Sequence, residues 1–166
     1  LHHNSNNAKS IYKLADKTKL VLAQNNQVVY NKAGLKITNL LGVSADNDNE
    51  NSIITLLQYN DFTMLFTGDA SAEGIATVLD KIPHNITVLK VPHHGAYGGV
   101  NKTILGHLKP KYSIISVGEN KFGHPAWYTL KLLKESKIYR TDVHNSILIK
   151  ANKKKVKIPE RKILSP

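Results

Sequence analysis

Two short apolar segments, each of strand length, end abruptly in residues that can bind a metal ion or hold a catalytic proton. The first is Leu65-Phe66-Thr67, followed by Gly68-Asp69, and the second is Val88-Leu89-Lys90-Val91, followed by Pro92-His93-His94-Gly95. In open α/β sheets, ligands gather at the carboxyl ends of the strands. The two segments therefore predict part of a hydrolytic metal site at one edge of a sheet.

The composition limits the kinds of protein that the chain can be. Its 166 residues fit one domain with a sizeable core. A content of 41% hydrophobic and 21% charged residues is ordinary for a globular protein and excludes global disorder. No apolar stretch approaches the ~20 residues that span a bilayer. There is no cysteine, so disulfides and Cys-type zinc sites are excluded, and histidines and carboxylates remain as metal ligands.

The net charge of +11 is concentrated at the C-terminus. Residues 150–166 hold seven basic residues against one acid, and we treat 151–166 as a basic tail. A polyanion partner such as nucleic acid and a simple solvated tail both fit this charge.

The two halves of the chain differ in their expected secondary structure. The first half predicts hairpins, whereas the second half alternates strands and helices, which indicates an α/β architecture in a single domain over residues 1–166. The expected strands are 20–23, 28–30, 35–38, 53–58, 62–66, 86–91, 112–117, 138–140, 146–150 and 156–158. The expected helices are 8–17, 71–81, 101–108 and 125–136, and 44–51 is expected to be a loop.

Three positions are candidates for chemistry, each with a structural alternative. Asp69 is either a carboxylate exposed at a strand end or the N-cap of the helix that follows. His93 and His94 are adjacent, and on extended backbone they would point in opposite directions, so at most one would bind a metal directly. His124 precedes an expected helix that begins at Pro125. In one interpretation, the positive helix end lowers the pKa of His124 and favours a role in proton transfer. In the other, His124 is a loop histidine at a helix cap.

The remaining histidines have no partner at ligand spacing, and we expect them to be structural or solvent-exposed. They are His2, His3, His84, His107 and His144.

Four motifs, in this order, together resemble one family. They are Thr67-Gly68-Asp69, the stretch 90–95, the stretch 110–118 and Gly123-His124-Pro125, with weaker similarity at 49–52 and 139–142. The set resembles the metallo-β-lactamase superfamily, and within it the C-terminal hydrolase domain of ComEC-type DNA-uptake proteins. The resemblance spans roughly residues 49–150.

The resemblance implies a fold and a site. The fold would be part of an αβ/βα sandwich of two sheets with outer helices. The site would hold two divalent metal ions, zinc or alternatively manganese, and a metal-bound hydroxide would attack a phosphodiester. The family's HxHxDH loop is absent, so we expect the chain to be the C-terminal portion of the domain, with an incomplete site. The implied metal ligands are Asp69 and His93, the implied catalytic residues are His94 and His124, and the expected substrate contacts are Lys90, Lys153, Lys154 and Lys155.

The function that the resemblance implies is a metal-dependent phosphodiesterase or nuclease associated with DNA uptake. The alternatives are a secreted hydrolase of small phosphoesters such as phosphocholine, and a non-catalytic nucleic-acid-binding remnant. The expected partner is DNA or another phosphate-bearing polymer. Membrane segments are expected to precede the chain in the full-length protein, with the domain on the extracytoplasmic face of a bacterial membrane, or secreted.

Overall fold

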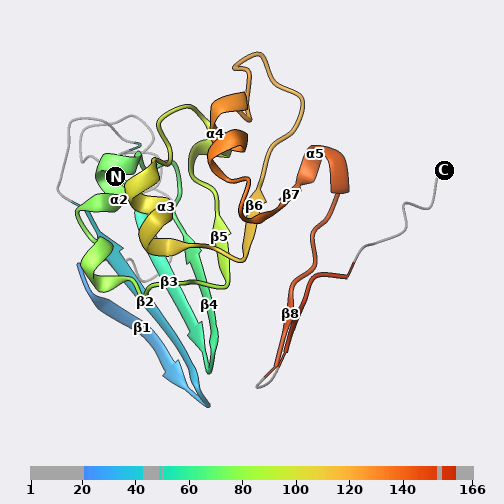
Figure 1. Ribbon diagram of the computed structural model, residues 1–166. Coiled ribbons are helices and arrows are strands. Elements are labelled where there is room, and N and C mark those ends of the chain that lie inside the picture. The colour runs from blue at the N-terminus through green and yellow to red at the C-terminus, as the bar shows by residue number, and fades with distance from the viewer. Residues whose placement is uncertain (1–20, 43–48, 50, 153–154, 160–166) are drawn as a thin grey trace, which may run out of the picture.

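The computed structural model describes residues 21–42, 49, 51–152 and 155–159. Their main feature is a seven-stranded sheet in the order β1-β2-β3-β4-β5-β6-β7, which Figure 1 shows. The strands β1 to β4 pair antiparallel, and β4 to β7 pair parallel. The strands are β1 (Gln27–Lys32), β2 (Leu35–Leu41), β3 (Ile53–Tyr59), β4 (Phe62–Phe66), β5 (Val88–Lys90), β6 (Tyr112–Ile115) and β7 (Lys137–Arg140).

Tight turns join the antiparallel strands. Ala33 and Gly34, between β1 and β2, both have positive φ, as a two-residue hairpin turn of type I′ requires. Asn60, between β3 and β4, also has positive φ, and Tyr59 pairs with Phe62 across that turn. The parallel strands need longer crossovers, so the helices of the described residues come after β4.

The helices are short and several have side-chain caps. Ser71 caps α2 by accepting from the Gly74 N–H, and Asn101 caps α3 by accepting from the Ile104 N–H. The helical elements are α2 (Ala72–Ala76), η1 (Leu79–Lys81), η2 (Pro92–Gly95), α3 (Lys102–Leu108), α4 (Trp127–Leu132) and α5 (Thr141–His144). A two-stranded sheet of β8 (Lys150–Ala151) and β9 (Val156–Lys157) follows them. Among the described residues, no helix is long and apolar enough to cross a membrane.

Both faces of the parallel strands are buried, in two separate clusters. Leu89 and Ile115 face a core that includes Ile75 of α2 and Ile104 of α3. Their strand neighbours Val88 and Ile114 face a second cluster with Phe62 and Tyr139, against which Ile147, Ile149, Val156 and Ile158 pack. This double burial explains why β5 and β6 are almost wholly apolar rather than alternating. The predicted α/β class is confirmed.

Several expected elements differ from those observed. Residues 21–23 do not form a strand. Of the expected strand 146–150, only Lys150 lies in a strand, because Ile147 and Ile149 pack onto the second cluster without pairing. The expected helix 71–81 stops at Ala76, where the Thr77 hydroxyl donates to the Gly74 carbonyl. Of the expected helix 125–136, only α4 is helical, and the His124–Pro125 peptide bond before it is cis.

Further differences concern the ends of elements and the parts that the structure does not describe. Helix α5 was not expected. The expected strands 86–91 and 112–117 are shorter at their ends, as β5 and β6. The expected helix 8–17 and most of the loop 44–51 lie outside the described residues.

Candidate active site

Asp69 lies just beyond the carboxyl end of β4 and is positioned by its backbone. Gly68 before it has a φ of +55°, and a Cβ there would come 2.8 Å from Ser52 Oγ, so only glycine fits. The same Ser52 hydroxyl accepts from the Asp69 N–H at 3.1 Å. Because Ser71, and not Asp69, caps α2, the Asp69 carboxylate is free of that structural task.

His93 and His94 form the turn η2 beyond the end of β5. Both have left-handed backbone, with φ of 46° and 53°, so the expectation of extended backbone was wrong. The Ala96 N–H donates to the His93 carbonyl and closes the turn, and the His93 N–H donates to the Gly68 carbonyl at 3.1 Å. The backbone therefore does not force the two rings to point in opposite directions. Their centroids are 6.4 Å apart.

His94 is oriented towards Asp69. Its Nδ1 lies 2.7 Å from the Ser116 carbonyl oxygen, and since a carbonyl can only accept, Nδ1 carries the proton. The other ring nitrogen, Nε2, lies 3.8 Å from Oδ1 of Asp69, with both side chains about half exposed. A backbone carbonyl that fixes one ring nitrogen and leaves the other free is typical of metal-binding histidines.

His124 joins the same group from the connection after β6. Its ring centroid is 5.7 Å from that of His93. The His124 pKa is lowered by burial first and by His93 and His94 next, while Asp69 acts in the opposite direction. The direction agrees with the prediction, and its causes are burial and the two neighbouring histidines. We call Asp69, His93, His94 and His124 the His–Asp cluster.

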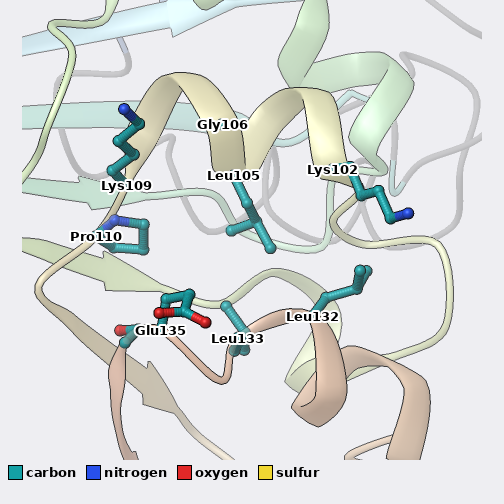
Figure 2. Close-up of a pocket in the computed structure, with 9 residues that line it drawn as sticks. Lys102, Leu105, Gly106, Lys109, Pro110, Leu132, Leu133 and Glu135 are labelled. Carbon is teal, nitrogen blue, oxygen red and sulfur yellow. The ribbon is translucent and has the colours of Figure 1, made fainter.

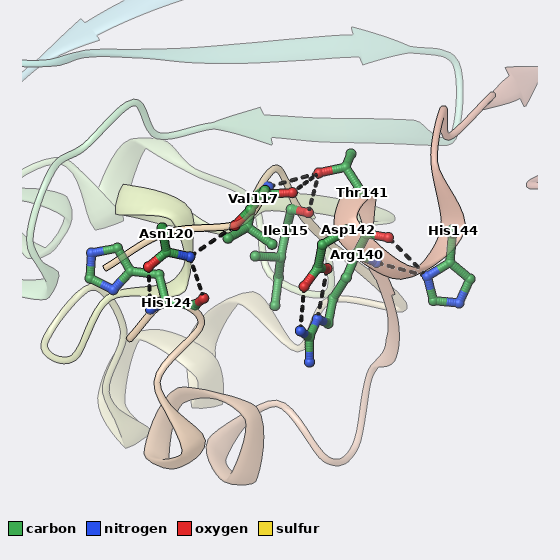
Figure 3. Close-up of polar contacts among 9 residues, drawn as sticks. Ile115, Val117, Asn120, His124, Arg140, Thr141, Asp142 and His144 are labelled. Atoms are coloured by element: carbon green, nitrogen blue, oxygen red, sulfur yellow. Dashed lines mark hydrogen bonds and ion pairs between the residues drawn. The ribbon is translucent and has the colours of Figure 1, made fainter. Parts of the chain in front are cut away.

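Asn120 holds the connection that carries His124. Its amide donates to the carbonyls of Gly118 and His124, and its Oδ1 accepts from the N–H groups of Phe122 and His124 (Figure 3). No sequence signal marks Asn120, because all of its partners here are backbone groups.

The end of β7 supports the same connection. The Thr141 hydroxyl accepts from the Val117 N–H at 2.7 Å and donates to the Val117 carbonyl at 2.6 Å (Figure 3). This contact holds the residue next to Ser116, whose carbonyl orients His94. Arg140 and Asp142 form an ion pair on the same segment. The weak similarity at 139–142 was the signal for these residues.

The lysines expected to contact substrate are spread over the chain. Lys90 lies at the end of β5 and donates from Nζ to the Val91 carbonyl at 2.9 Å, and burial lowers its pKa against the effect of nearby Asp69. Lys155 is exposed between β8 and β9, in a hairpin that runs away from α4 in Figure 1. Lys153 and Lys154 lie outside the described residues. Contact of these lysines with substrate stays a prediction.

A separate cavity of about 410 Å³ lies between α3 and the segment that follows α4 (Figure 2). Leu105, Leu132 and Leu133 give it an apolar lining, and Lys102, Lys109 and Glu135 add charge. It contains none of the predicted site residues.

The donors of the His–Asp cluster fit a divalent cation in type and spacing. Zinc bonds to carboxylate oxygen and imidazole nitrogen are each ~2.0–2.2 Å, so an Oδ1–Nε2 separation of 3.8 Å between Asp69 and His94 is too long for a hydrogen bond but can span one ion. Within the part of the chain that the structure describes, no group of three or more His, Cys, Asp or Glu side chains is arranged to hold a metal ion. Among the described residues, Asp69 and His94 are therefore a pair of candidate metal ligands.

No family model matches the chain. It is 33% identical over 103 residues to ComE operon protein 3 of Bacillus subtilis, and 29% identical over 100 residues to Recombination protein 2 of Haemophilus influenzae. Each match covers 60% of this chain, but only 13% and 12% of the respective relatives. The chain is a relative of the ComEC-type competence proteins.

Solved structures agree on the fold of this ComEC-type domain. A protein of Parabacteroides distasonis assigned as a metal-dependent hydrolase aligns with a TM-score of 0.51 at 11% identity, over 82% of this chain and 61% of that one. CmlA, a diiron β-hydroxylase of Streptomyces venezuelae, aligns with a TM-score of 0.51 at 13% identity, over 84% of this chain and 38% of that one. The chain therefore shares the mixed α/β fold of these metal-dependent proteins, and these identities show the fold alone.

Proposed function

We propose that this ComEC-type domain is part of a metal-dependent phosphodiesterase that cleaves nucleic acid during DNA uptake. The observation that carries the proposal is the His–Asp cluster, with Nε2 of His94 oriented towards Asp69 by the Ser116 carbonyl. The similarity to ComE operon protein 3 supports the connection with DNA uptake.

Within the proposal, Asp69 and His94 would hold a divalent cation, zinc or manganese. A cation bound there would act as a Lewis acid and lower the pKa of a bound water. This gives His94 the role of ligand that we first expected for His93, because His94 has the fixed Nδ1 proton and the short distance to the carboxylate. His93, beside His124, is then better placed to contact the substrate.

His124 would transfer protons. Its lowered pKa keeps the imidazole neutral near pH 7, so that one ring nitrogen can accept a proton from a water or a substrate hydroxyl. Asn120 fixes the backbone on both sides of this residue and thereby limits where the ring can reach.

Charge supports a polyanionic substrate. The net charge of +11 attracts a phosphate polymer, and Lys90 lies at the end of the same strand that leads into the histidine turn. We further propose that the domain works on the extracytoplasmic face of a bacterial membrane, where entering DNA would reach it.

Hydrolysis of labelled DNA with Mn²⁺ or Zn²⁺ tests the proposal, using the longest form in which the gene product is expressed. The variants Asp69→Asn and His94→Ala should lose most of the activity. His84→Ala is the control, because His84 contacts His107 and lies outside the cluster. Absence of hydrolysis with metal bound, or full activity in Asp69→Asn, would contradict the proposal.

A further inference from the structure

Three large aromatic side chains are exposed next to the His–Asp cluster. Tyr97, Phe122 and Trp127 have 75%, 82% and 71% of their surface accessible, the three highest values among the large hydrophobic residues that the structure describes. Exposure of such rings is costly in water, and exposed aromatic groups usually serve recognition.

The rings lie within three residues of the catalytic candidates in the sequence. Tyr97 is three residues after His94, and Trp127 is three residues after His124. Tyr128 lies between these two rings, with centroids 5.4 Å from Tyr97 and 5.8 Å from Trp127. On the other side, the Phe122 ring lies nearly parallel to that of His124, at 19° and 5.8 Å.

The aromatic groups are fixed to the histidine turn. The Ala126 N–H donates to the Gly95 carbonyl at 2.9 Å, and the buried Thr129 hydroxyl donates to the Ala96 carbonyl at 2.9 Å. The segment that carries Trp127 therefore runs beside the segment that carries His94 and Tyr97. The backbone that carries Tyr97 and Trp127 is therefore held beside the histidine turn.

Positive charge accompanies the rings. Nζ of Lys131 lies 5.7 Å from the Trp127 ring centroid, and Lys121 directly precedes Phe122. Aromatic faces interleaved with cations are how proteins bind single-stranded nucleic acid, with bases stacked on the rings and phosphates beside the cations. Bases that are paired and stacked within a duplex cannot cover these rings.

We propose that Tyr97, Phe122 and Trp127 form a stacking platform that selects unpaired nucleotides and leads them to the His–Asp cluster. This inference rests on the proposed function and names the form of its substrate. The three residues are specificity-determining residues, since they bind bases without taking part in hydrolysis.

Trp127 is the only tryptophan of the chain, so its fluorescence reports on the platform directly. The protein is titrated in EDTA, so that binding is measured without turnover, with a short oligo(dT), with a duplex of the same length and with heparin. We expect oligo(dT) to quench the fluorescence and to bind more tightly than the duplex. Heparin, a polyanion without bases, should bind without quenching.

Binding of labelled oligo(dT) to single variants completes the test. Tyr97→Ala, Phe122→Ala and Trp127→Ala should each weaken binding about 5- to 150-fold, the equivalent of ~1–3 kcal/mol per stacked base. Tyr30→Ala, at a 43% exposed tyrosine of β1, is the matched control and should bind like the unmodified protein. Circular dichroism confirms that each variant is folded.

The outcomes separate this inference from the proposed function. Equal affinity for duplex and oligo(dT), unchanged fluorescence, or absence of an effect in all three variants would overturn the platform, even if the protein hydrolyses DNA. Selective, ring-dependent binding without hydrolysis under any metal would support the platform and contradict the nuclease.

Discussion

Nε2 of His94 lies 3.8 Å from Oδ1 of Asp69, although the two residues follow different strands and are 25 positions apart. The contact is produced by parallel pairing of β4 with β5, which places both strand ends at the same edge of the sheet. It also depends on a backbone carbonyl, that of Ser116, which follows a third strand.

This pair predicts a cation site that can be measured without any substrate. Asp69→Asn and His94→Ala should each weaken Mn²⁺ or Zn²⁺ binding at least about tenfold, because even the loss of a supporting contact at a metal site costs that much. Isothermal titration calorimetry measures the affinity. His84→Ala should leave it unchanged, and equal affinity in all variants would rule out the pair as ligands.

Substitution of the neighbours of His124 should raise or lower the pKa of His124 in a direction that depends on which neighbour is changed. Burial, His93 and His94 lower it, so His93→Ala should raise it, whereas Asp69→Asn should lower it further. Since the folded chain binds this proton less readily than the unfolded chain, the contribution of His124 to stability is full above its ordinary pKa of 6.5 and falls as the pH drops below that value. NMR titration of the imidazole signals measures both shifts, and opposite signs would contradict the arrangement.

Gly95 and Gly98 provide a matched pair for the packing of the histidine turn. Both have positive φ, of 83° and 85°, but a Cβ on Gly95 would lie 2.7 Å from the Pro125 Cβ, whereas one on Gly98 meets no atom within 4 Å. Gly98→Ala should therefore cost only the backbone term, about 1–2 kcal/mol. Gly95→Ala should cost about 2–5 kcal/mol in total, since overpacking adds to it. Chemical denaturation measures the difference, and equal losses would show that the contact with Pro125 is easily relieved.

The ion pair between Arg140 and Asp142 predicts a pH dependence of stability. The hydrogen bond from Arg140 holds the Asp142 pKa below its ordinary value of 3.8. The contribution of the ion pair to folding stability is present above pH 3.8 and disappears as the pH falls through the lowered pKa of Asp142. Asp142→Asn should thus lower the midpoint of thermal unfolding at pH 7 and have less effect in strong acid. Glu135→Gln removes the more exposed pair with Lys134 and should change little at either pH.

The sequence predicts the sheet well where apolar runs and turn residues agree. The run Ile53 to Gln58, the turn at Asn60-Asp61 and the run Phe62 to Phe66 give β3 and β4 almost residue for residue. The pattern fails at Ser146 to Lys150, where Ile147 and Ile149 alternate as in a strand but are partly buried against the second cluster without strand pairing.

The candidate site is only partly visible in the sequence. Residue types pointed to Asp69, His93, His94 and His124, and the structure brings these four together. The orientation of His94 was not predictable, because any residue supplies a carbonyl like that of Ser116. The left-handed backbone at His93 and His94 was also missed, since only a few per cent of non-glycine residues adopt it and no local pattern marks it.

The division of the sheet into an antiparallel and a parallel part has a consequence for how such a domain can change over evolutionary time. The cluster residues and the exposed rings all lie on connections that follow parallel strands, and the antiparallel strands β1 to β3 carry none of them. Replacing residues 118–127 would exchange Phe122, Trp127 and His124 while leaving every strand ladder intact. A descendant could acquire a new substrate by changing one connection, and the inherited sheet would continue to fold as before.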